Sequence, residues 1–369
     1  MIIYCYTSQF NVMYDIYGKI LGGEYMKRVF YNILKEKLKE NKEFDIVTII
    51  KSNDIKKIGK KILKIDNQWI IEDKSNLEFY KDVTNKINSN ENGRKVKIND
   101  DTEIMIEHIT PKSNLVICGG GHIALELSKV AKMLDFSVTV IDDRKEFANT
   151  ERFPFVDKVI CNNFKDSLGE AGFNSNSYFV IVTRGHRDDQ VCLEIILKNQ
   201  FRYLGMIGSK AKIANSIRQL LEKGYTTEDI NKINAPVGLN IGAKTPAEIA
   251  ISIAAEIIKI KNEKNISSID EEILKNITQS KKRMVLASIL DKRGSSPRGI
   301  DAKMLVIEDG TFIGTIGGGS VENAVYEKAI ELIKEKSSHI ETYDLSNTVA
   351  AKLGMACGGT IKVLFEYIE

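Results

Sequence analysis

The stretch Val116-Ile117-Cys118-Gly119-Gly120-Gly121-His122-Ile123-Ala124 decides the fold of this chain. Residues 115–117 are apolar and predict a buried strand. After the three glycines, apolar residues return at helical spacing through Ala124, Leu127 and Ala131. A strand, a glycine turn and a helix, with the pattern Gly119-x-Gly121-x-x-Ala124, match the dinucleotide-binding fingerprint, in which Ala is accepted as the third member.

This fingerprint predicts a site for a phosphorylated ligand. Glycines let the backbone approach a pyrophosphate, and the helix N-terminus presents free N–H groups to it. The next predicted strand, residues 137–141, ends at Asp142, close to where an acid meets a ribose hydroxyl. We therefore expect a doubly wound α/β sheet of the Rossmann type. The alternative is a glycine turn that only packs.

Later strands add polar residues to the same edge of the predicted sheet. Residues 178–183 form a buried strand that runs into Arg184-Gly185-His186, and residues 203–207 lead to Gly208-Ser209. In such sheets ligands bind beyond the carboxyl ends of the strands, so these side chains are candidates for the site. His186 would be the general acid or base of an oxidoreductase, or else a surface or ligand-binding residue.

The composition excludes several classes of protein. The chain has 369 residues, 43% hydrophobic and 28% charged, which predicts two or three globular domains rather than disorder. A net charge of +3 gives no reason to expect nucleic acid or an anionic membrane as partner. No apolar run has the length of a membrane span, and the N-terminus lacks the pattern of a signal peptide. The five cysteines have neither disulfide nor metal spacing, so we expect a cytoplasmic protein.

The two ends of the chain resemble each other. Residues 44–51 resemble residues 283–290, and two further strands align in the same way, 61–66 with 303–308 and 104–109 with 363–368. The glycine-rich loops of the second copy have no counterpart in the first. We interpret this as a duplicated α+β module with a degenerate first copy. The alternative is chance similarity of short Ile/Lys-rich strands. The expected divisions are an extension (1–25), the degenerate module (26–110), the Rossmann domain (111–262), a linker (263–282) and the intact module (283–369).

The intact module has three unusual loops. One loop carries Ser295, Ser296 and Arg298, and a second, Gly317-Gly318-Gly319, opens a helix that contains Glu322. This glycine turn is either a second anion site or a structural turn. The third loop contains Cys357, which is either a reactive thiol beside small residues or a buried inert cysteine.

Taken together, these motifs resemble the XdhC/CoxI-type accessory proteins of molybdenum hydroxylases such as xanthine dehydrogenase. The resemblance covers most of residues 111–369. In the Rossmann part it rests on Gly119-Gly120-Gly121-His122, Asp142-Asp143-Arg144, Phe147-Ala148-Asn149, Arg152-Phe153-Pro154, Thr183-Arg184-Gly185-His186 and Gly205-Met206-Ile207-Gly208-Ser209-Lys210. In the last module it rests on Gly294-Ser295-Ser296-Pro297-Arg298, Gly314-Thr315-Ile316-Gly317-Gly318-Gly319, Val321-Glu322 and Cys357-Gly358-Gly359.

The resemblance implies an accessory factor without turnover of its own. Such a factor binds the molybdenum cofactor, as molybdopterin or its dinucleotide form, and protects it while a desulfurase supplies sulfur. It then inserts the cofactor into the hydroxylase apoenzyme, and we expect it to be a homodimer. The candidate cofactor-binding residues are Gly119, Gly121, His122, Asp142, Arg144, Arg184, His186, Gly208, Ser209, Ser295, Ser296, Arg298, Gly317, Gly318, Gly319, Glu322, Cys357 and Gly358.

The family usually places the glycine/cysteine module before the Rossmann domain, whereas here the intact module comes last. The alternative function is an NAD(P)-dependent oxidoreductase that uses the fingerprint and Asp142. The hydroxylase itself is excluded, because the sequence has no iron–sulfur cysteine runs.

Overall fold

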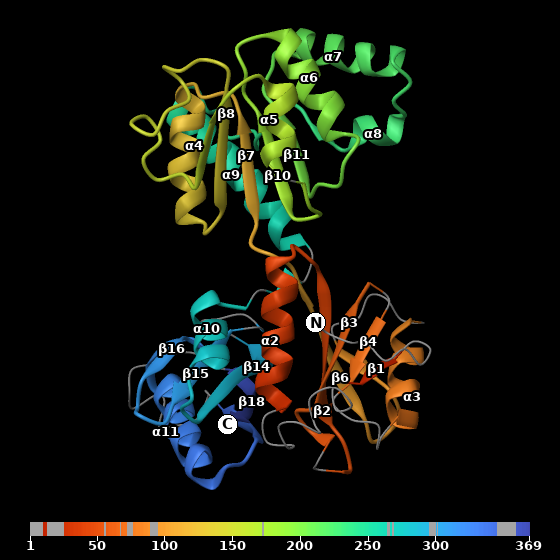
Figure 1. Ribbon diagram of the computed structural model, residues 1–369, viewed down its shortest axis with the longest axis vertical. Helices are drawn as coiled ribbons and strands as arrows, with labels where there is room; N and C mark the ends of the chain where they lie inside the picture. Colours follow the sequence, from red (N-terminus) through yellow and green to blue (C-terminus); the bar gives the residue numbers. More distant parts are fainter. Residues whose placement is uncertain are drawn as a thin grey trace. The chain divides into compact units, whose positions relative to one another are not determined.

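The computed structural model describes residues 10–12, 26–54, 57–66, 68–71, 77–88, 95–171, 173–263, 266–267, 269–294, 300, 302–344 and 359–369. The chain divides into two compact units (Figure 1). One unit is the central segment Pro111–Lys264, and the other combines Met1–Thr110 with Asn265–Glu369.

The central unit has the predicted Rossmann topology. Its six strands lie in the order β12-β11-β10-β7-β8-β9, and every neighbouring pair is parallel. The chain order reverses between β7 and β10, and this reversal is the point where such sheets bind ligands. The strands are β7 (Asn114–Cys118), β8 (Ser137–Asp142), β9 (Lys158–Cys161), β10 (Ser177–Ile181), β11 (Tyr203–Met206) and β12 (Ile233–Asn234).

Helices cover both faces of this sheet (Figure 1). Helices α4 (His122–Met133) and α9 (Pro246–Glu263) bury apolar residues on one face. Helices α5 (Phe164–Ala171), α6 (His186–Ile196) and α7 (Lys210–Glu222) pack on the other, and α7 leads to the short α8 (Thr227–Asn231). A capping box marks the start of α9, because the Glu248 N–H donates to the Thr245 hydroxyl and the Thr245 N–H donates to the Glu248 carboxylate.

The other unit contains two modules with the same topology. Their sheets have the strand orders β4-β3-β2-β6-β5 and β16-β15-β14-β18-β17. The first module comprises α2 (Met26–Lys39), β2 (Phe44–Lys51), β3 (Lys61–Ile65), β4 (Gln68–Ile71), α3 (Leu77–Asn88), β5 (Lys95–Lys97) and β6 (Glu103–Ile109). The second comprises α10 (Glu271–Gln279), β14 (Met284–Gly294), β15 (Lys303–Ile307), β16 (Phe312–Gly314), α11 (Gly319–Glu335), β17 (His339–Asp344) and β18 (Gly359–Ile368). The predicted fold class, a Rossmann-type domain flanked along the chain by two α+β modules, is confirmed.

The register of the strands corrects one detail of the expected repeat. Thr48 lies opposite Lys61 in the first module, and Ser288 lies opposite Lys303 in the second. Thr48 therefore corresponds to Ser288, and the alignment of residues 44–51 with 283–290 was one residue out. Both strands are runs of apolar residues on which a shift by one position leaves the pattern almost unchanged, whereas cross-strand pairing fixes the register.

The two modules share a core. One face of each sheet packs on the module's own helix, α3 or α11, and these helices lie at opposite sides of the unit in Figure 1. The other faces meet each other and helices α2 and α10. Residues 263–282, expected to be a linker, contain α10, whose Ile273, Leu274 and Ile277 are buried in this shared core.

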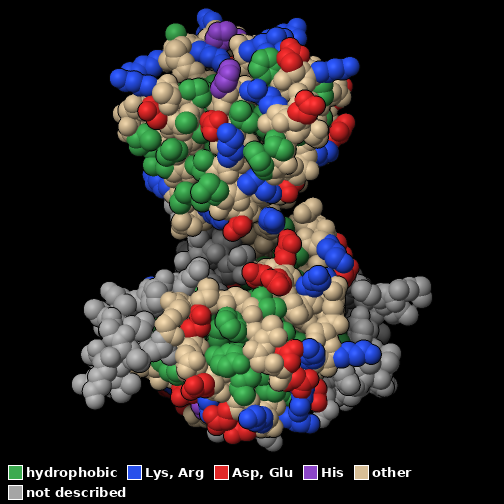
Figure 2. All heavy atoms as spheres, turned by 90° about the vertical axis from the view of Figure 1, so that its left-hand side faces the viewer, with side chains coloured by type: hydrophobic (Ala, Val, Ile, Leu, Met, Phe, Trp, Pro, Cys, Tyr) green, Lys and Arg blue, Asp and Glu red, His purple; other side chains and the backbone are tan. Residues whose placement is uncertain are grey.

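Two short strands extend the first sheet. β1 (Phe10–Val12), from the expected N-terminal extension, pairs with β4, and β13 (Ile266–Ser267) pairs with β6. Figure 2 shows basic and acidic side chains interspersed on the visible face of both units, which agrees with the small net charge. Within the described part of the chain, we find no helix with the length and apolar character needed to cross a membrane.

Candidate functional site

The predicted residues of the central unit lie at the carboxyl ends of four neighbouring strands. Gly119 and Gly121 follow β7, Asp142 ends β8, Arg184 follows β10, and Gly208 follows β11. The candidates His122 and His186, the first residues of α4 and α6, are exposed, as is Ser209 at the start of α7. Figure 2 shows histidine and Lys/Arg side chains together at one end of this unit. The edge therefore offers cationic side chains and helix N-termini, the groups that bind phosphate.

The three glycines of the turn have different surroundings. A Cβ on Gly119, which has φ +112°, would lie 2.5 Å from the Val182 carbonyl oxygen, and a Cβ on Gly120 would lie 2.0 Å from that of Phe147. These two glycines are required by the close approach of the protein's own backbone. A Cβ on Gly121 would meet nothing within 4 Å. Gly121 is thus the member of the turn that faces open space, at the N-terminus of α4.

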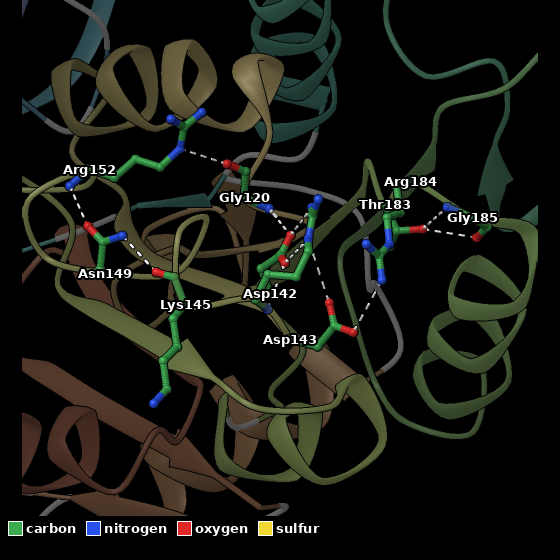
Figure 3. Close-up of polar contacts among 10 residues, drawn as sticks. Gly120, Asp142, Asp143, Lys145, Asn149, Arg152, Thr183, Arg184 and Gly185 are labelled. Carbon is green, nitrogen blue, oxygen red and sulfur yellow. Dashed lines mark hydrogen bonds and ion pairs between the residues drawn. The ribbon is translucent and has the colours of Figure 1, made fainter.

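Asp142 is bound within the protein. Its carboxylate accepts the Gly120 N–H at 2.8 Å and the Arg144 N–H at 3.1 Å (Figure 3). The Arg144 guanidinium donates from Nε at 2.9 Å and from Nη2 at 3.0 Å. Burial favours a higher pKa for Asp142, but these donors outweigh it and hold the pKa below its usual value. The side chain is 2% exposed, and its four acceptor positions are all used.

The loop after β8 folds over the glycine turn, which sequence reasoning did not foresee. The Arg144 guanidinium lies 3.8 Å from the centre of the Phe147 ring. Arg152 Nε donates to the Gly120 carbonyl at 2.9 Å (Figure 3). Asn149 accepts the Arg152 N–H at 2.8 Å. Phe147, Asn149 and Arg152 lie in two motifs that this chain has in common with the XdhC/CoxI-type proteins. Those motifs were the signal in the sequence that could have identified these residues.

A second network was also missed, and it fixes the starts of α6 and α7. The Thr183 hydroxyl donates to Asp189 at 2.7 Å, and Asp189, fully buried, forms an ion pair with Lys212. Arg184, next to this network, is 60% exposed and lies 3.8 Å from Asp143 (Figure 3). Ser209 caps α7 by accepting the Lys212 N–H at 3.3 Å, so Gly208 and Ser209 form the turn that leads into this helix.

In the second module, the glycine turn Gly317–Gly319 also binds an internal carboxylate. Glu322 accepts the N–H groups of Ile316 at 3.2 Å and Gly318 at 3.1 Å, together with the Thr315 hydroxyl. Burial favours a higher pKa for Glu322, but these hydrogen bonds outweigh it and keep the pKa below its usual value. An external anion at these amides would have to displace Glu322.

The remaining candidates of the second module lie outside the described residues. They are Ser295, Ser296, Arg298, Cys357 and Gly358.

Comparison with known proteins agrees with the expected resemblance. The sequence model of the XdhC Rossmann domain matches residues 115–257, and that of the XdhC and CoxI family matches residues 277–344. The chain is 34% identical over 152 residues to the uncharacterized protein YqeB of Escherichia coli (strain K12), covering 41% of this chain and 28% of that protein. It is 32% identical over 160 residues to a probable xanthine dehydrogenase subunit of Bacillus subtilis (strain 168), covering 43% of this chain and 46% of that protein.

The chain thus spans less than half the length of the curated relatives it matches. Among solved structures, a xanthine dehydrogenase from Bacillus halodurans is 25% identical with a TM-score of 0.49, over 62% of this chain and 65% of that one.

Proposed function

Because this chain belongs to the XdhC and CoxI family, we propose that it is an accessory factor of a xanthine dehydrogenase-type molybdenum hydroxylase. In this role it binds the molybdenum cofactor, protects it during sulfuration and inserts it into the apoenzyme. The observation that carries the proposal is the presence in one chain of both family segments, residues 115–257 and 277–344.

The carboxyl edge of the Rossmann sheet fits the phosphate of a pterin cofactor. Gly121 leaves open space beside the N-terminus of α4, and Arg184 and His186 are exposed on the neighbouring strand and helix. We propose that these three residues, with His122 and the turn at Gly208 and Ser209, hold the phosphate, or the dinucleotide form of the cofactor. The bound cofactor supplies the molybdenum–sulfur chemistry, and the protein supplies binding and shielding from water.

Asp142 and Arg144 then support this site indirectly. Arg144 holds the Asp142 carboxylate by hydrogen bonds, and this carboxylate holds the glycine turn by accepting the Gly120 N–H. The same bonds argue against an NAD(P)-dependent oxidoreductase, because the ribose hydroxyl would find no free acceptor on Asp142. Glu322 fixes the second glycine turn in the same way.

The remaining elements of the proposal come from the resemblance. We propose that Ser295, Ser296, Arg298, Cys357 and Gly358 form the second half of the site, with Cys357 near the soft metal–sulfur centre. We further propose a cytoplasmic homodimer that meets a sulfur-donating desulfurase and the hydroxylase apoenzyme. The segments 26–110, 111–262 and 283–369 are proposed as its functional domains.

The test is cofactor retention by the full chain, expressed in a host that makes the molybdenum cofactor. Molybdenum is measured by metal analysis and pterin by oxidation to its fluorescent form, in the wild type, in Cys357→Ser and in Cys161→Ser, a control at an exposed cysteine of the Rossmann sheet. We expect metal and pterin in the wild type and in the control, and less of both in Cys357→Ser.

Absence of both from the wild type, even after addition of cofactor released from another molybdoenzyme, would refute the cofactor-binding role. Titration with NAD(P)H would then test the alternative. Equal retention in all three proteins would keep the role and remove Cys357 from the site.

A further inference from the structure

Two buried ion pairs join the two modules of the repeat. Lys61 Nζ of the first module lies 2.5 Å from Glu366 Oε2 of the second. Lys303 Nζ of the second lies 2.6 Å from Glu107 Oε1 of the first. In each pair the lysine side chain is 9% exposed and the glutamate 4%. The two contacts have the same chemistry, nearly the same length and the same burial.

The four residues occupy equivalent positions in the two modules. Lys61 faces Thr48 across β2 and β3, as Lys303 faces Ser288 across β14 and β15. Glu107 faces Ile46, as Glu366 faces Leu286. The lysine of each module therefore pairs with the equivalent glutamate of the other module.

The apolar part of this interface repeats the same symmetry. Ile50, Met105, Leu290 and Leu364 form one buried cluster. Ile50 and Leu290 lie at matching irregularities of the ladder, between Ile49 and Lys51 in one sheet and between Ile289 and Asp291 in the other. Met105 and Leu364 each lie two residues before the paired glutamate. The cluster thus consists of two equivalent pairs.

Such reciprocal contacts are those of an isologous interface, in which a two-fold rotation exchanges the two sides. The second module alone carries both halves of the contact, Lys303 and Glu366. Two copies of it would pair the Lys303 of each with the Glu366 of the other. We propose that this face of the C-terminal module is a self-pairing surface for a second module of its own kind, and that the N-terminal copy occupies it within the chain.

This pairing gives the first module a structural role for which its strands suffice and the glycine-rich loops of the second module are not needed. Removing one member of a buried ion pair leaves a buried charge without compensation, which is strongly destabilising. The second module therefore needs a partner that supplies Lys61 and Glu107, and the Tyr31 hydroxyl of the first module adds a hydrogen bond of 2.8 Å to Glu366. It does not need the partner's glycine turn, and residues 72–76, before α3, contain no glycine where the second module has Gly317–Gly319 before α11. A homodimer of the whole chain would then form through another surface.

The test reverses the charges of one module in the full chain. In the double variant Lys61→Glu/Glu107→Lys, both contacts become repulsive, while the C-terminal face keeps Lys303 and Glu366. We expect this variant to associate through its C-terminal modules, with a concentration-dependent increase above the wild-type mass in analytical ultracentrifugation. The control reverses all four charges by adding Lys303→Glu and Glu366→Lys. This restores both pairs within the chain, so the wild-type mass should return.

A folded double variant with the wild-type mass at all concentrations would overturn the proposal. So would a control that associates as strongly as the double variant. If the double variant is unfolded, Lys61→Ala/Glu107→Ala removes both attractions without adding repulsion. The mass of this variant is then compared with that of the wild type in the same way. Cofactor content does not enter this test, so its outcome is independent of the proposed accessory function.

Discussion

The carboxylate of Asp142 accepts the amide N–H of Gly120 at 2.8 Å, across 22 positions of the sequence. In the dinucleotide-binding fingerprint, an acid at the end of the second strand binds the cofactor's ribose, and the glycine turn binds its pyrophosphate. Here the acid binds the turn itself. Glu322 does the same in the C-terminal module, where it accepts the N–H of Gly318. The glycine turns 119–121 and 317–319 are therefore both held in place by internal carboxylates.

Asp142→Asn tests the structural role of this residue. The substitution removes the charge that pairs with Arg144, and we expect it to destabilise the Rossmann unit by about 1–3 kcal/mol. For a unit of this size, each kcal/mol lowers the Tm by about 2–4 °C. Thermal unfolding followed by circular dichroism measures the shift. Asp143→Asn is the matched control, because Asp143 is 39% exposed and 3.8 Å from the same guanidinium. Equal shifts in the two variants would contradict the role given to Asp142.

The glycine turn gives a pair of variants with opposite expected effects. Gly120→Ala places a methyl group against the Phe147 carbonyl, so we expect a loss of stability of about 1–3 kcal/mol or more. Gly121→Ala meets open space, and its φ of −69° suits alanine, so the Tm should stay close to that of the wild type. In the accessory-factor role, this methyl group should still lower pterin retention several-fold. Full retention by a folded Gly121→Ala protein would exclude close contact of the cofactor with this turn.

Glu322→Ala should free the amides of the second glycine turn. We expect a loss of stability of about 1–3 kcal/mol, because partly buried N–H groups lose their acceptor. Phosphate in the buffer should restore part of the Tm by binding to the vacated amides. Glu327→Ala, on the exposed side of the same helix, is the control and should not respond to phosphate. If phosphate raises the Tm of both variants equally, the turn is not an anion site.

His108 makes the stability of the first module depend on pH. Its Nδ1 lies 2.7 Å from Asp45 and its Nε2 lies 3.6 Å from Glu43, and hydrogen bonding to these carboxylates raises the pKa of His108 to about 9. The folded-state pKa lies above the unfolded value of about 6.5. The stabilisation is therefore complete below about pH 6.5 and is lost as the pH rises through about 9.

Thermal unfolding of wild type and His108→Gln at about pH 6 and about pH 10 measures this dependence. The difference in Tm should be largest at the lower pH and nearly absent at the higher one. His339→Gln, at an exposed position of β17, serves as the control for the loss of a histidine. A difference that stays constant over this range would show that the ion pairs of His108 do not contribute.

Much of the local structure was predictable from short sequence patterns. The glycine turn between β7 and α4 follows from residues 115–131. The pattern Thr-Pro-Ala-Glu of residues 245–248 is likewise typical of a helix start, and two hydrogen bonds of a capping box form there. The repeat was recognised from its strands. Its register was predicted one residue out, because Thr48 and Ser288 are aligned by the strands they pair with and not by their own neighbours.

The sequence by itself determined the order of the elements, the Rossmann class of the central unit and the presence of two related modules, because helical and strand periodicity are properties of neighbouring residues. Only the tertiary structure decided which partners the charged residues contact. Whether Asp142 meets a ligand or Gly120, and whether Lys303 pairs with Glu107, depends on which donors the fold brings within about 3 Å of each carboxylate. Gly120 lies 22 positions from Asp142 and Lys303 lies 196 positions from Glu107, and no local pattern specifies these two contacts.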